Sequence, residues 1–105
     1  MCQLLALVGN KKSAFMPGMV VDLPAMSDKD RADIRWGVDS DIDYIAASFI
    51  RKASDVLEIR DFVTAYMKEK QLAHKPVPRI ISKIESTEAL VNFDEILQVR
   101  GWCYL

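Results

Sequence analysis

Apolar and polar residues follow one another along the chain in blocks that predict strands and helices in turn. Residues 42–50, IDYIAASFI, are mostly apolar, which is typical of a strand covered on both faces in a parallel sheet. Residues 79–85, RIISKIE, open with the same character and are the second predicted strand. Residues 71–78 contain two prolines, so they are predicted to be a loop.

Capping residues and apolar stripes predict three helices around these strands. Ser27, with Asp30 three residues later, is a capping-box pattern and predicts a helix over residues 28–39. Ser54 is the candidate cap of a second helix between the strands, which carries an apolar stripe of Val56, Ile59, Val63, Tyr66 and Met67. The strands and the helix between them predict a βαβ unit.

The third helix follows the second strand. Either Ser86 or Thr87 is expected to cap it. Its apolar residues are predicted to share one face: Leu90, Phe93 and Leu97 with Ala89 and Ile96. The order is therefore helix, strand, helix, strand, helix, which predicts an α/β fold with a parallel sheet. Two such strands cannot form a stable sheet alone, so the chain is expected to be part of a larger α/β domain.

Composition excludes several classes of function. The chain has 105 residues and a formal net charge of −1, so no basic field favours nucleic acid or an anionic membrane. Cys2 and Cys103 form neither a disulfide framework nor a zinc-ligand spacing, and a single histidine, His74, makes no metal site. No targeting or membrane-spanning segment is predicted, so the cytoplasm is the expected location.

Charged residues at the end of the second strand are the strongest candidates for chemistry. Side chains alternate across a strand, so Lys83 and Glu85 share one face with Ile81. The carboxyl ends of parallel strands are where ligands bind in α/β proteins. An ammonium there can bind phosphate oxygens, and a carboxylate can hold a divalent cation. The alternative is a structural ion pair at the rim of the sheet, although buried charge pairs seldom favour stability alone.

The end of the first strand gives a weaker signal. Ser48 shares a face with Ala46, and Arg51 and Lys52 follow at the mouth of the predicted site. Without a base near it in the sequence, Ser48 is interpreted as a packing residue.

Three long stretches resemble the pyruvate kinase family. They are KKSAFMPGMVVDLPAMSDKD, DIDYIAASFIRKASDVLEIRDFV and RIISKIESTEALVNFDEIL, and together they extend from about residue 11 to residue 97. The resemblance implies transfer of a phosphoryl group from phosphoenolpyruvate to ADP, giving pyruvate and ATP in glycolysis. It also implies Mg²⁺ and K⁺ as cofactors, a cytoplasmic location and a homotetrameric parent enzyme.

The resemblance also implies an architecture, a TIM (β/α)8 barrel interrupted by a lid domain. Residues 25–97 would be a partial barrel, the arc from helix three through helix five. Residues 1–24 would be a non-matching start and the re-entry from the lid, and residues 98–105 a non-matching tail.

Site residues carry over from the family one by one. Lys83 matches the lysine that stabilises the moving phosphoryl group, and Glu85 matches a magnesium ligand. Ser48 and Phe49 match residues beside the substrate, and Lys12 matches a lysine on the nucleotide side.

Two of the places where the sequence departs from the family concern the site. It reads SAFMPG after Lys12, and QVRGWCYL after Leu97, where the family carries its second magnesium carboxylate. The K⁺ ligands also lie outside this chain. The fragment alone is therefore expected to be inactive.

Two other interpretations remain open. One is a non-enzymatic truncated paralogue that docks on a full-length partner through its unpaired strand edges. The other is a different phosphoenolpyruvate-handling barrel enzyme.

Overall fold

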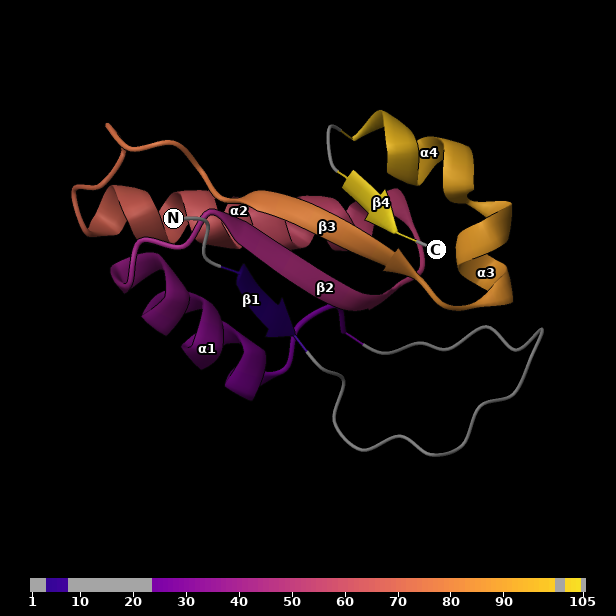
Figure 1. Cartoon of the computed structure of the whole chain (residues 1–105), viewed down its shortest axis with the longest axis horizontal. Helices are drawn as coiled ribbons and strands as arrows, with labels where there is room; N and C mark the ends of the chain where they lie inside the picture. Colours follow the sequence, from indigo (N-terminus) through magenta and orange to yellow (C-terminus); the bar gives the residue numbers. More distant parts are fainter. Residues whose placement is uncertain (1–3, 8–23, 100–101, 105) are drawn as a thin grey trace.

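The computed structural model describes residues 4–7, 24–99 and 102–104, and it is an α/β structure, as the sequence predicts (Figure 1). In chain order the elements are β1 (Leu4–Leu7), α1 (Asp28–Asp39), β2 (Tyr44–Ile50), α2 (Ala53–Glu69), β3 (Arg79–Ile84), α3 (Thr87–Val91), α4 (Phe93–Gln98) and β4 (Trp102–Tyr104). The two predicted strands and the first helix are confirmed, and the proline-containing stretch before β3 is a loop.

The described strands form one parallel sheet in the order β1-β2-β3-β4. The two central strands, β2 and β3, are the predicted ones, and they lie side by side in the predicted parallel orientation. The prediction of only two strands was wrong, because β1 and β4 extend the sheet on either side. These strands have four and three residues, and at that length a periodic pattern cannot be recognised in a sequence.

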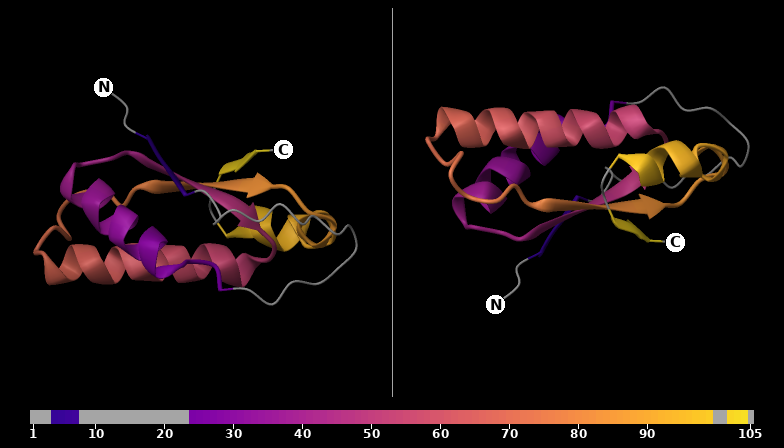
Figure 2. Two further views of the ribbon diagram at one scale, coloured as in Figure 1. Left: turned by 90° about the horizontal axis from the view of Figure 1, so that it is seen from below. Right: turned by 90° about the horizontal axis from the view of Figure 1, so that it is seen from above.

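Among the described residues, the helices all lie on one face of the sheet and none covers the other, which is called the bare face below (Figure 2). The burial of β3 follows this arrangement, since Ile80, Ser82 and Ile84 are buried while Ile81 and Lys83 are half-buried. The predicted faces of β3 are thus confirmed. In both views of Figure 2, β1 and β4 lie further from the helices than the central strands do, so the sheet curves away from the helix layer.

Two of the predicted helix caps are present and one is not. Ser27 and Asp30 form a complete capping box, and Ser86 caps α3 by accepting a hydrogen bond from the Ala89 amide. The prediction of Ser54 as a cap was wrong. The N-cap of α2 is Lys52, whose side chain makes no capping bond, and the Asp55 carboxylate instead accepts a hydrogen bond from the Arg51 amide.

The third predicted helix is divided at Asn92 into α3 and α4. Ala89 and Ile96 are buried against the sheet layer as predicted, with Phe93 packed beside them. The prediction that Leu90 and Leu97 share this face was wrong, since they are 59% and 50% exposed. Residues 89, 93 and 96 already form a complete stripe at helical spacing, so the two leucines fall outside it.

Within the part of the chain that the structure describes, none of the helices combines the length and the apolar composition needed to cross a lipid bilayer.

Candidate functional site

The candidate site lies on the bare face of the sheet, at the carboxyl ends of β2 and β3. The Lys83 Nζ atom donates a hydrogen bond to the Ser48 Oγ atom over 3.4 Å. These residues are 35 positions apart in the sequence and meet because β2 and β3 are parallel neighbours. A cation and a hydroxyl group are therefore held together where parallel α/β proteins bind ligands.

Glu85 joins the same group from the residue just beyond β3. Its Oε1 atom lies 3.5 Å from Lys83 Nζ, and the two side chains are 34% (Lys83) and 40% (Glu85) exposed. The ion pair that a structural interpretation predicts is thus present. Because it is partly exposed, salt and water screen it, and a surface pair of this kind contributes only about 0–1 kcal/mol to stability. The arrangement is equally open to an anionic ligand at Lys83 and a cation at Glu85.

A β-bulge in β2 includes Ser48 and decides which face of the sheet Ile50 occupies. Ala47 pairs with Ser82, and Ile50 pairs with Ile84. Between these two pairs β2 therefore advances by three residues and β3 by two. Strict alternation would put Ile50 on the bare face beside Ala46 and Ser48. The extra residue instead returns Ile50 to the core, where it is 2% exposed. Bulges often occur next to active sites, where they redirect a side chain.

The structure does not describe the side chains of two predicted site residues. Lys12 lies outside the described residues. The backbone of Phe49 belongs to β2, but its side chain also lies outside what the structure describes.

Metal-binding capacity at the described part of the site is limited to one carboxylate, that of Glu85. Among residues 4–7, 24–99 and 102–104, no group of three or more His, Cys, Asp or Glu residues is placed so that it could hold a metal ion. The carboxylate of Glu85 is nevertheless a ligand of the type that Mg²⁺ prefers.

A buried polar group behind the site was missed in the sequence. Arg51 and Asp55 are each only 4% exposed, and Arg51 Nε lies 3.5 Å from Asp55 Oδ2. Asn92 Nδ2 donates a hydrogen bond of 3.0 Å to the Arg51 carbonyl oxygen. The basic pair Arg51-Lys52 suggested an exposed mouth. The sequence did indicate a local ion pair, because Arg51 and Asp55 are four residues apart at the start of a helix. Nothing in the sequence indicated the contact with Asn92.

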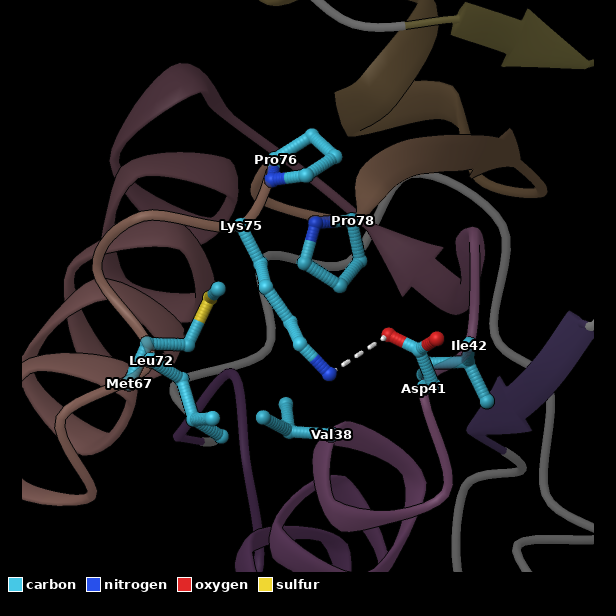
Figure 3. Close-up of a pocket in the computed structure, with 8 residues that line it drawn as sticks. All are labelled: Val38, Asp41, Ile42, Met67, Leu72, Lys75, Pro76 and Pro78. Carbon is cyan, nitrogen blue, oxygen red and sulfur yellow. Dashed lines mark ion pairs between the residues drawn. The ribbon is translucent and has the colours of Figure 1, made fainter.

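A hollow at the opposite ends of the strands does not compete with this site. It is lined by residues before β2 and β3 together with parts of α1 and α2, and the ion pair of Lys75 with Asp41 closes one side at 3.5 Å (Figure 3). Its cavity volume of about 10 Å³ is space for about one water molecule, which excludes a substrate.

Comparisons with known proteins agree with one another. A family model described as "Pyruvate kinase, barrel domain" matches residues 1–102. The pyruvate kinase of Dictyostelium discoideum is 49% identical over 92 residues, which are 88% of this chain. The cytosolic isozyme of Solanum tuberosum is 43% identical over 98 residues (92% of the chain), and the enzyme of Geobacillus stearothermophilus is 49% identical over 89 residues (85%).

The chain spans only a small part of these relatives. The matched region is 17% of the Dictyostelium protein, 18% of the Solanum protein and 14% of the Geobacillus protein. The likeness is therefore close in sequence but covers less than a fifth of each complete enzyme.

Proposed function

Because the chain belongs to the pyruvate kinase family, we propose that it supplies part of an active site that transfers a phosphoryl group from phosphoenolpyruvate to ADP. The observation that carries the proposal is the meeting of Lys83, Ser48 and Glu85 at the carboxyl ends of adjacent parallel strands. Phosphoryl transfer is catalysed mainly by positioning and by electrostatic stabilisation, which need charges of both signs at one point.

Lys83 is the catalytic residue in this proposal. Its ammonium group faces the bare side of the sheet, where it can approach the equatorial oxygens of the moving phosphoryl group. Negative charge on those oxygens must be stabilised in the transition state, and a fixed cation does this without reorganising. Ser48 lies at hydrogen-bond distance from the ammonium and orients it, and Phe49 is proposed to lie beside the substrate.

Glu85 is the proposed protein ligand for Mg²⁺. A bound magnesium ion would neutralise charge on the substrate oxygens. One carboxylate fits part of such a site, and the rest of the ligands must come from substrate, water and residues outside this chain. The K⁺ ligands are likewise assigned outside the chain, and Lys12 is proposed to serve the nucleotide.

The architecture that we propose is an arc of a TIM (β/α)8 barrel. The parallel strands, the helices confined to one face and the curvature of the sheet support it (Figure 2). Residues 25–97 would extend from barrel helix three through helix five, after a re-entry segment from the lid domain within residues 1–24. The complete enzyme is proposed to be a cytoplasmic homotetramer of glycolysis.

A chimera tests the proposal directly. Residues 25–97 replace the matching segment of the Geobacillus stearothermophilus enzyme, and this protein is called the chimera below. We expect turnover that requires phosphoenolpyruvate, ADP and Mg²⁺ in an assay coupled to pyruvate reduction. A folded chimera without turnover would contradict the proposed function.

Glu85→Gln in the chimera should raise the Mg²⁺ concentration needed for half-maximal activity, because the amide keeps the shape but loses the charge that attracts the cation. Activity should return in part at high Mg²⁺. Glu58→Gln, an exposed acid-to-amide change on α2, is the control and should leave the Mg²⁺ dependence unchanged. An unchanged dependence in Glu85→Gln would remove this residue from the proposed ligands.

A second candidate function is docking on a full-length partner without catalysis. Exposed apolar side chains on α3 and α4 favour it, since Leu90, Val91 and Leu97 are 59%, 79% and 50% exposed. Co-purification of the 105-residue chain with an intact pyruvate kinase, abolished by Leu90→Asp, would support this function.

A further inference from the structure

We infer that Arg51, Asp55 and Asn92 form a brace that positions Ser48, and through it Lys83, for phosphoryl transfer. The inference rests on the proposed function for its catalytic consequence. Its structural basis is a set of contacts behind the site, in which the three residues come from different parts of the chain. Arg51 directly follows β2, Asp55 lies in the first turn of α2, and Asn92 lies at the junction of α3 and α4.

Ser48 needs support because it lies in the bulge. The pairing of β2 with β3 passes from Ala47 directly to Ile50, and the pairing of β2 with β1 that the structure describes ends at Ala47. Among the residues that the structure describes, none therefore pairs with Ser48 in the register of the sheet, whereas Tyr44 to Ala47 all have such partners. The backbone on the carboxyl side of the bulge must be held by other contacts if Ser48 is to stay within reach of Lys83.

Asp55 provides the first of these contacts. Its Oδ2 atom accepts a hydrogen bond of 3.0 Å from the Arg51 amide and also lies 3.5 Å from Arg51 Nε. One carboxylate thus fixes both the backbone and the side chain of the residue that directly follows β2. Since buried ion pairs are weak contributors to stability, directional control of the backbone is the better explanation for this pair.

Asn92 provides the second contact, from the junction of α3 and α4. It occupies the N-cap position of α4, where an asparagine side chain usually caps its own helix. It makes no such bond, and its amide instead donates to the Arg51 carbonyl oxygen across 41 sequence positions. Both the N–H and the C=O of Arg51 are therefore held by side chains, three residues after Ser48.

The geometry links the brace to catalysis. The Lys83 ammonium lies 3.4 Å from Ser48 Oγ, so a small displacement of Ser48 would break this hydrogen bond. A misplacement of about 1 Å can cost about 10²-fold in rate when it moves a catalytic group. Arg51, Asp55 and Asn92 are thus positioning residues that act through Ser48.

Asn92→Ala and Asp55→Ala in the chimera test the brace. We expect each to lower kcat by about 10- to 100-fold with little change in KM, because groups are misplaced rather than lost. Asp55→Asn should retain more activity than Asp55→Ala, since an amide oxygen can still accept from the Arg51 amide. Glu95→Ala on α4 and Asp61→Asn on α2 change exposed side chains and are the matched controls.

A double-mutant cycle with Ser48→Ala separates positioning from general destabilisation. In the Ser48→Ala background, Asn92→Ala should cost less than about 3-fold in kcat, because residues that act as a unit are not additive. Multiplicative losses, or losses that match the fraction of unfolded protein measured by thermal denaturation, would overturn the inference.

Labelling of Lys83 with an amine reagent, followed by mass spectrometry, needs no catalytic activity. In Asn92→Ala the labelling rate of Lys83 should rise to the rate seen in Ser48→Ala, while that of Lys29 on α1 stays unchanged. An unchanged Lys83 rate would overturn the brace. A chimera without turnover that still shows the Lys83 response would instead refute the proposed function and retain the brace.

Discussion

Lys83→Met in the chimera should lower kcat by about 10²–10³ and leave KM nearly unchanged. Methionine has a similar length and no charge, so the pocket keeps its shape while the developing charge on the phosphoryl oxygens loses its cation. An interaction made mainly in the transition state affects kcat, whereas one made equally with the substrate affects KM. Steady-state kinetics at saturating Mg²⁺ provide the measurement.

Lys75→Met is the matched control for this substitution. Lys75 is also a lysine in a partly exposed ion pair, with Asp41, but it lies at the opposite ends of the strands (Figure 3). Its replacement should leave kcat within about 2-fold, in line with the small value of surface ion pairs. A rise in KM alone for Lys83→Met would mean that Lys83 binds the substrate without stabilising the transition state.

The 105-residue chain on its own should show no phosphoryl transfer above that of its Lys83→Met variant. It covers less than a fifth of each relative described above, and a TIM barrel usually needs about 250 residues. Among the described residues, Glu85 supplies one carboxylate to the site, and one protein ligand is too few to hold Mg²⁺ in place. The bare face of the sheet should also make the chain partly unfolded or prone to aggregation.

A coupled assay with phosphoenolpyruvate, ADP, Mg²⁺ and K⁺ measures the activity of the isolated chain. Backbone hydrogen exchange on the same sample reports whether β3 is formed. Turnover above the variant, or strong protection of Ile80 to Ile84 in a monomer, would show that the chain is a competent domain by itself.

Local signals in the sequence were sufficient for the central part of the fold. The capping box at Ser27 fixes the start of α1, and the apolar runs identify β2 and β3. The position of Lys83 and Glu85 on the bare face followed from the alternation of side chains along β3. Such signals depend only on near neighbours, which is why they could be recognised in a single sequence.

Features that depend on distant contacts could not be predicted. Short strands such as β1 gain their conformation by pairing with β2, and three or four residues carry no periodic signal. The bond from Asn92 to Arg51 joins positions 41 apart, and nothing in either local sequence indicates it. Ser48 was interpreted as a packing residue for the same reason, because its neighbour Lys83 is distant in the sequence.

Between Ala47 and Ile50, β2 has one residue more than its pairing with β3 requires. If one residue between Ala47 and Ile50 were deleted, β2 and β3 would have equal steps, and Ile50 would still oppose Ile84 and still face the core. The shorter strand would be the more regular one, with a continuous register against β3. Regular pairing of the sheet therefore does not account for the extra residue, which lies beside the hydrogen bond between Ser48 and Lys83.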